Sequence, residues 1–384
     1  MFYAAILLLA AAFFTSFVGT FLARRTARRF GLMDDPGHRK VHTVATPRNG
    51  GIGIFWGFAL PLLMGVAAVL FFGAQHDIYK VELHFFGYTQ TLDLPLYLPG
   101  MRAHIPLLLT FLAATLLIHI LGLIDDRKAM PPWPKLLAQL AIASALVVAG
   151  EFVDPIRGGA FRILTSIGFV PSFLLSVFWI VALTNAFNFL DNMDGLSAGV
   201  AFICALAFLI AAIFNGQLFI AALLLTFMGS VLGFLCFNFP PASIFMGDGG
   251  SMVLGFILSV LTIRTTYYDA SKPPEQRHWF VVLMPLFVMA VPLYDLIIVM
   301  VLRVKKGRSP MTGDTNHFSH RLTRHGFSKR GAVLLIYAVT LATGFAAPLL
   351  ARVNDDASAL LLAGQLLAIL IVIAILERVG EHTQ

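Results

Sequence analysis

Charged residues are scarce in this sequence. Asp, Glu, Lys and Arg make up 12% of the 384 residues, against about 25% in an ordinary soluble protein. So few charges could not cover the surface of a soluble domain. Hydrophobic residues reach 58%, and apolar runs of about 20 residues recur from end to end, each long enough to cross about 30 Å of hydrocarbon as a helix. We therefore predict a polytopic membrane protein.

Cysteine is almost absent. Cys204 and Cys236 lie in or at the edge of apolar segments and predict no disulfide framework. A cleavable signal peptide is not expected either, because residues 1–20 lack a basic n-region and a clear small-residue cleavage site. The apolar runs are continuous rather than alternating, which argues against a transmembrane barrel.

The spans predict one all-α membrane domain over residues 1–384 with eleven transmembrane helices. Their expected ranges are 2–23, 50–72, 104–124, 135–150, 170–188, 197–213, 217–236, 250–267, 279–302, 331–350 and 357–377.

The distribution of Lys and Arg orients these spans. The loops on the side of 24–49 and 303–330 hold 19 of the 27 basic residues, and the other loops hold 8. The positive-inside rule therefore places the N-terminus outside and the C-terminus in the cytoplasm. The same excess of basic residues in the inner loops explains the net charge of +7. We therefore expect no nucleic-acid partner.

The first inner loop contains Arg39, Lys40 and His42 ahead of the paired glycines Gly50 and Gly51. Arginine and lysine beside a membrane can hold phosphate or anionic headgroups, and paired glycines allow close backbone approach. The loop is a candidate substrate-binding segment, and the alternative is an ordinary positive-inside loop.

Two adjacent carboxylates, Asp125 and Asp126, end the third predicted span. They repel each other unless a cation neutralises them, and Mg²⁺ prefers one or two carboxylates together with phosphate oxygens. The alternative, a solvated helix end, is unfavourable because acidic residues meet the negative end of the helix dipole there. Lys135 opens the next helix and could reach a phosphate, although a lone lysine is more often a snorkelling anchor.

A second acidic group follows the fifth span. Asp191 and Asp194 would share one face with Asn188 if the stretch were helical. The loop has no Lys or Arg to balance the two carboxylates. Helix capping before Gly195 would explain one aspartate, but less easily both.

A glycine-rich stretch places Asp248 just before the eighth span, ten residues after Asn238. Glycines that lead into a helix N-terminus make an anion site, where Asp248 could carry a metal ion against the anion. A plain N-cap is the commoner meaning of such a short pattern.

The last inner loop contains two histidines, His317 and His320, followed by Arg321. Histidine can donate to phosphate oxygens, ligate metal or shuttle protons. Asp295 lies within the ninth span, where a carboxylate is costly. Because it is near the inner end and Arg303 lies two turns on, we expect a structural or supporting role for it.

These groups converge on one face. Their chemistry fits a diphosphate held by Mg²⁺, with Mn²⁺ as the alternative ion, and clamped by cations, because phosphoryl transfer needs positioning and charge neutralisation. A site on the cytoplasmic side of a bilayer suggests a soluble activated donor and a lipid acceptor.

Six sequence stretches also resemble, in this order, those of the polyprenyl-phosphate N-acetylhexosamine-1-phosphate transferases: DDPGHRKVH, TPRNGG, GLIDD, NAFNFLDNMDGL, FNFPPASIFMGDGGS and HFSHRL. The resemblance implies that a UDP-sugar, usually UDP-GlcNAc, gives its sugar-1-phosphate to undecaprenyl phosphate and releases UMP with Mg²⁺. It also implies the bacterial inner membrane, a cytoplasmic active site and the first membrane step of cell-envelope polysaccharide synthesis. Expected partners are undecaprenyl phosphate, a UDP-N-acetylhexosamine, the bilayer and a second copy of the chain.

The resemblance also implies residue roles. Asp125 and Asp126 look like the paired aspartates near the lipid phosphate and its deprotonation, and Asp248 looks like the metal-ligand aspartate. Asp191 and Asp194 look like a second acidic pair near metal or nucleotide, and Asp191 is also expected to be a metal ligand. Lys135, Asn188 and Asn238 are expected to bind substrate. His317, His320 and Arg321 look like the loop that touches the donor. Many members carry a third histidine where this chain has Ser319, which bears on donor contacts.

Three alternatives stay open. The donor could be UDP-MurNAc-pentapeptide or a modified hexosamine, although RKVH in the first loop and HRL in the last look closer to the GlcNAc-type branch. A transporter or lipid flippase would place ionisable groups near the bilayer midplane. A non-catalytic scaffold poorly explains so many uncompensated carboxylates.

Overall fold

The computed structural model describes residues 2–34, 45–72, 81–85, 88–92, 94–154, 159–265, 279–311, 316–350, 353 and 355–379. Most of these residues are helical, which confirms the predicted all-α membrane fold. A bilayer offers the backbone no water, and a helix satisfies its own N–H and C=O groups. The candidate residues Arg39, Lys40 and His42 lie outside the described residues.

The long helices follow the predicted spans with shifted ends. They are α1 (Phe2–Thr26), α2 (Gly51–Phe72), α3 (Leu94–Arg127), α4 (Pro132–Val153), α5 (Phe169–Leu190), α6 (Leu196–Phe214), α7 (Leu218–Asn238), α8 (Asp248–Arg264), α10 (Ala290–Lys305), α12 (Lys329–Gly344) and α14 (Asp356–Val379). The short helices are α9 (Met284–Val288), α11 (Phe318–Arg324) and α13 (Ala347–Leu350).

Two pairs of short antiparallel strands lie in loops where no strand was predicted. They are β1 (Met33–Asp34) with β2 (Thr46–Pro47), and β3 (Val81–Phe85) with β4 (Tyr88–Leu92). Two-residue strands such as β1 and β2 are too short to produce the alternating pattern by which a strand is recognised in a sequence.

Within the described ranges, nine helices are long and apolar enough to cross a membrane, or ten if one bent pair forms a single span. That pair, Phe280–Val288 and Ala290–Lys305, is bent by 71°, so the predicted span 279–302 is not one straight helix. Pro292 lacks the N–H that would bond the carbonyl of Val288, which disfavours a continuous helix there.

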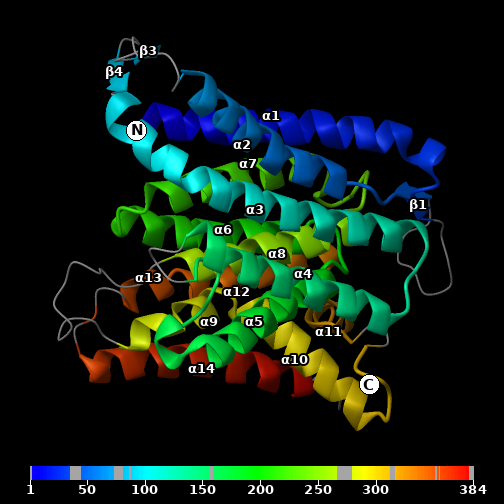
Figure 1. Ribbon diagram of the computed structural model, residues 1–384. Coiled ribbons are helices and arrows are strands. Elements are labelled where there is room, and N and C mark those ends of the chain that lie inside the picture. Colours follow the sequence, from blue (N-terminus) through cyan, green and yellow to red (C-terminus); the bar gives the residue numbers. More distant parts are fainter. Residues whose placement is uncertain are drawn as a thin grey trace.

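The predicted eighth span, 250–267, corresponds to α8, whose 17 residues reach only the short limit of a spanning helix. The number of crossings and their orientation therefore stay predictions. In Figure 1, α1 begins and α14 ends at opposite ends of the bundle, as an odd number of crossings requires.

Helix α8 forms the centre of the bundle, and every residue from Gly249 to Thr262 is buried. Helices α3 and α5 pack along it, with α2 and α6 completing its surroundings. Helices α1 and α14 lie along the two outer edges (Figure 1). Their most apolar windows are only 17% and 11% buried, so their apolar side chains are left for lipid.

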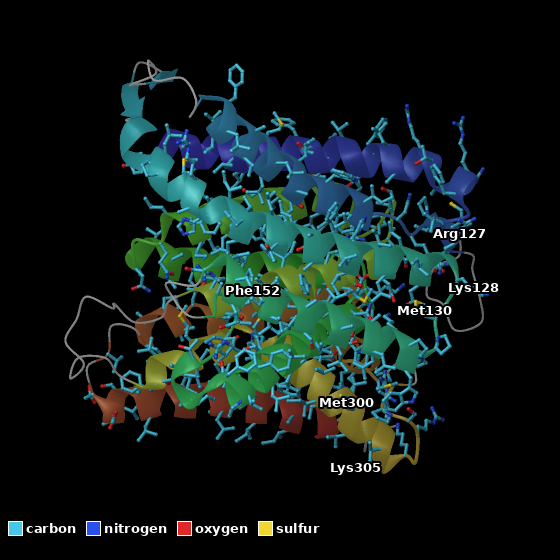
Figure 2. All side chains as sticks on the ribbon, viewed as in Figure 1. Arg127, Lys128, Met130, Phe152, Met300 and Lys305 are labelled. Atoms are coloured by element: carbon cyan, nitrogen blue, oxygen red, sulfur yellow. The ribbon has the colours of Figure 1, made fainter. Side chains whose placement is uncertain are left out.

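One end of the bundle gathers the sequence motifs. Helix α3 ends there and α4 begins there (Figure 1), and the short helix α11 begins against Asp295 of α10. Figure 2 shows Arg127, Lys128 and Met130 at this end, which Lys305 also shares. We call it the motif end.

The contact between α3 and the start of α8 depends on Gly122. A Cβ atom at this position would lie 2.5 Å from the carbonyl oxygen of Asp248 and 2.5 Å from the Cα of Gly249. No side chain fits there, so glycine allows the two backbones to touch.

We predict that Gly122→Ala destabilises the protein by about 1–3 kcal/mol, the usual cost of overpacking. The matched control is Gly100→Ala on the same helix, where an added Cβ would meet nothing within 4 Å and where alanine should stabilise the helix by about 0.5–1 kcal/mol. Thermal unfolding in detergent measures both. Equal midpoints for the two variants would contradict the close contact.

Candidate active site

The first turn of α8 is capped by a residue of another helix. Asp126 of α3 accepts hydrogen bonds from the backbone N–H of Asp248 at 2.8 Å and of Gly249 at 2.9 Å. Gly247 precedes the helix at a φ of 70°, a conformation that glycine adopts without strain. Asp126 is 5% exposed, and both of its oxygens are occupied. The structure therefore places Asp126 as the cap that holds α8 against α3.

Asp125, the residue before Asp126, faces Lys135 at the start of α4. Lys135 Nζ donates to Asp125 Oδ2 at 2.8 Å and also forms an ion pair with Asp248. Asp125 additionally accepts a hydrogen bond from the backbone N–H of Met130. One lysine thus bridges two carboxylates from α3 and α8, whereas a snorkelling lysine would point its amine into water.

Asn188, in the last turn of α5, completes this arrangement. Its Nδ2 donates to Asp248 Oδ1 at 3.0 Å and to Ser251 Oγ at 2.9 Å, and its Oδ1 lies 3.5 Å from Lys135 Nζ. The predicted residues Asp125, Asp126, Lys135, Asn188 and Asp248 therefore form one hydrogen-bonded group, which we call the acid–lysine cluster.

Asp191 is different from these residues. Helix α5 ends at Leu190, so Asp191 and Asp194 lie in a turn and not on one helical face. Among the described residues the Asp191 carboxylate accepts no hydrogen bond. Withdrawal from water, followed by the negative charges of Asp248, Asp126 and Asp194, raises the pKa of Asp191 well above the usual aspartate range. Negative charge is thus concentrated beside the cluster.

Asp194 and Asn238 form hydrogen bonds with backbone groups of neighbouring segments. Asp194 Oδ2 accepts from the N–H of Ala242 at 2.9 Å. Asn238 is 3% exposed; it accepts from Gly195 N–H and donates to the carbonyl of Ile244, both at 2.9 Å. Both amide atoms of Asn238 are therefore occupied, and the structure places it behind the acidic turn rather than in the cluster.

Residues 317–321, which we call the histidine segment, form hydrogen bonds with α10 and with the turn at 191–194, which we call the acidic turn. Asp295 of α10 contacts His317 and the first N–H of α11, while Ser319 Oγ donates to Asn192 Oδ1 in the acidic turn. Arg321 is buried and donates to the carbonyl of Asn316. The structure therefore brings the histidine segment beside the acidic turn, as one face of the same site.

His320 is the more exposed of the two histidines. Partial burial and then the positive charges of His317 and Arg324 lower its pKa. A histidine with a lowered pKa is neutral at pH 7 and can both donate and accept a hydrogen bond.

A divalent cation fits this donor set. Among the described residues, no three His, Cys, Asp or Glu side chains are close enough to hold a metal ion by themselves. Mg²⁺, however, is commonly held by one or two carboxylates together with substrate phosphates and water. Asp191 and Asp248 would hold it, since repulsion between them and Asp126 is what a cation would relieve.

Some residues of the site were not singled out from the sequence. His119 of α3 is 3% exposed, and its Nδ1 contacts the carbonyl of Gly249 at 2.7 Å. Its ring stacks on Phe55 at 4.7 Å. An ionisable residue within an apolar span, seven residues before Asp126 on the same face of α3, was the available signal.

Comparison with known proteins agrees with the motifs. A family model described as glycosyl transferase family 4 matches residues 108–266, which run from α3 to just beyond α8. The chain is 31% identical over 325 residues to a Bacillus subtilis protein named probable undecaprenyl-phosphate N-acetylglucosaminyl 1-phosphate transferase, covering 85% of this chain and 79% of that protein.

Two further relatives have related names. Identity is 34% over 345 residues to the decaprenyl-phosphate N-acetylglucosaminephosphotransferase of Mycolicibacterium smegmatis, covering 86% of this chain and 77% of that protein. It is 26% over 320 residues to the undecaprenyl-phosphate alpha-N-acetylglucosaminyl 1-phosphate transferase of Escherichia coli, with coverages of 82% and 76%.

We predict that Asp191→Asn stabilises the protein while its function is lost. A carboxyl whose pKa is raised by folding favours the folded state at low pH, and this contribution disappears as pH rises through the folded pKa. The variant should therefore unfold at a higher temperature than the wild type at pH 7, and the difference should shrink toward pH 4. A lower midpoint for Asp191→Asn at pH 7 would mean that the carboxylate stabilises the fold.

Proposed function

Because the chain belongs to glycosyl transferase family 4, we propose that it transfers N-acetylglucosamine-1-phosphate from a UDP-sugar to a polyprenyl phosphate and releases UMP. The observation that carries the proposal is the acid–lysine cluster at the motif end. It joins carboxylates from α3 and α8 to one lysine beside Asp191, whose carboxylate accepts no hydrogen bond from the residues that the structure describes.

The reaction exchanges one phosphoanhydride bond for another. An oxygen of the polyprenyl phosphate attacks the phosphorus that carries the sugar, the bond to the nucleotide's phosphate breaks, and UMP leaves with the electron pair. Positioning and charge neutralisation supply the acceleration in such transfers. A divalent cation, when bound, supplies neutralisation of the diphosphate charge.

The protein's residues have separable roles in this proposal. Asp126 holds the start of α8, so that Asp248 stays at the helix N-terminus. Asp191 and Asp248 would hold Mg²⁺, or Mn²⁺ as the alternative. Asp125 holds Lys135 at 2.8 Å beside the substrate phosphates; because the ion pair makes the carboxylate a weaker base, we assign Asp125 no proton transfer. His317, His320 and Arg321 face the donor.

We favour direct attack by the lipid phosphate over an aspartyl intermediate. Asp125 and Asp126 accept hydrogen bonds or ion pairs on both of their oxygens, and Asp248 does the same through Lys135 and Asn188. Each such bond withdraws electron density that a nucleophile needs. The tied carboxylates suit binding better than attack.

We place the site on the cytoplasmic face of a bacterial inner membrane. The last turn of α1 contains Arg24 and Arg25, and that of α10 contains Arg303 and Lys305. Both helices end at the motif end (Figure 1), and the positive-inside rule assigns such an end to the cytoplasm. UDP-sugars then reach the site from the cytosol.

The test is UMP release by the purified protein in detergent with undecaprenyl phosphate, Mg²⁺ and a panel of UDP-sugars. We expect the highest rate with UDP-GlcNAc, a requirement for the lipid, and loss of activity in EDTA that Mg²⁺ restores. UDP-MurNAc-pentapeptide and modified hexosamines belong in the panel as rival donors.

Asp248→Asn should lower this rate by about 10²-fold or more, the usual effect of removing one charged group from such a site. Asp154→Asn is the matched control, because Asp154 pairs with Arg264 at the opposite end of α8, at 3.7 Å. UMP release that needs no lipid, or no release from folded protein with any donor, would contradict the proposal and favour a transporter.

A further inference from the structure

Asp295 is a fully buried carboxylate in α10, with 0% of its surface exposed. Its Oδ2 lies 2.8 Å from His317 Nδ1, and its Oδ1 accepts a hydrogen bond from the backbone N–H of Phe318 at 2.6 Å. An ionisable residue inside a spanning helix is costly and usually functional. Here both of its oxygens are directed to the first residues of the histidine segment.

This contact decides which ring nitrogen of His317 is available. A carboxylate that already accepts from Phe318 N–H can only accept from the imidazole as well, so the proton lies on Nδ1. Any ligand must then meet Nε2. The ring also packs edge-on against Phe189, at 6.0 Å between centroids and 89° between planes, so its orientation is held from two sides.

Charged groups of both signs lie around the Asp295–His317 pair. Asp295 supplies the buried negative charge. Arg303 lies over Phe189 at 4.9 Å, and Arg324 of α11 acts on the neighbouring His320. The other histidine of the segment, His320, has its ring centroid 6.4 Å from that of His317.

We propose that Asp295 is a positioning residue that keeps Nδ1 of His317 protonated and thereby reserves Nε2 for a phosphate oxygen of the substrate. The proposal rests on the function proposed above for the identity of that substrate. A phosphate oxygen can come from the UDP-sugar diphosphate or from the polyprenyl phosphate. When the phosphate binds, Nε2 takes a proton from the solvent and donates it to the phosphate oxygen in a charge-assisted hydrogen bond, while Nδ1 keeps its own proton against Asp295.

The test is the ¹⁵N spectrum of histidine-labelled protein in lipid nanodiscs, with the His317 signals identified by their loss in His317→Gln. Without substrate, we expect a protonated Nδ1 and a bare Nε2. In Asp295→Asn the side-chain carbonyl still accepts from Phe318 N–H, while the amide donates to Nδ1. The proton should then lie on Nε2, the opposite tautomer.

Ser319→Ala is the matched control, because it removes the hydrogen bond that ties α11 to Asn192 without touching the His317 ring. We expect the wild-type tautomer in this variant. The same tautomer in wild type and Asp295→Asn, or equal changes in both variants, would overturn the positioning role and leave Asp295 as a structural cap of α11.

Separate additions of UDP-GlcNAc and polyprenyl phosphate identify the ligand. The one whose addition protonates Nε2 in the wild type provides the contacting phosphate, and no response to either would overturn the phosphate contact. The kcat for UMP release should fall about 10²-fold in Asp295→Asn, with a smaller change in KM. The tautomer is measured without substrate and does not depend on UMP release. A failure of the proposed function can therefore be distinguished from a failure of this inference.

Discussion

The ion pairs of Lys135 with Asp125 and Asp248 join the start of α4 to the end of α3 and the start of α8. Without this lysine, the carboxylates of α3 and α8 would meet at the membrane edge without compensation. A single lysine offsets only part of this negative charge, and the remainder falls on Asp191, whose pKa is raised. Asp126 and Asn188 hold Asp248 in place through hydrogen bonds to its backbone N–H and its carboxylate.

The same contacts hold the centre of the bundle together. Helix α8 is buried along almost its whole length, and its first turn is fixed by Asp126 through two N–H groups and by His119 through the carbonyl of Gly249. Gly122 lets the two backbones approach closely enough for both contacts. Residues of the site therefore also position the central helix, and a variant in this region must be tested for folding as well as for activity.

Much of this arrangement could be predicted from the sequence. Apolar length located the helices, and the position of Asp125, Asp191 and Asp248 at the ends of apolar spans marked them as candidates, because carboxylates at a membrane edge need a partner. The different roles of these aspartates could not be predicted. Asp126 differs from Asp125 only in the side of α3 that it occupies, and its role as the cap of α8 depends on a contact 122 residues away in the chain.

Other features of the structure depend on contacts that the spacing of residues in the sequence does not specify. Asn238 matches the family pattern, yet both of its amide atoms serve the backbone. The bend between α9 and α10 interrupts a span that hydropathy predicts as continuous. Asp295 was expected to have a supporting role, but its partner His317 lies 22 residues on, across a loop whose path no local pattern specifies.

The central claim is that the carboxylates of Asp191 and Asp248 form a divalent-cation site. The most direct test is the thermal-unfolding midpoint as Mg²⁺ is added at constant ionic strength, for the wild type and for Asp191→Ala. A ligand that binds only the folded state raises the midpoint in a saturable manner. The account predicts such a rise for the wild type and little or none for Asp191→Ala. Equal rises in both, or none in the wild type, would contradict it.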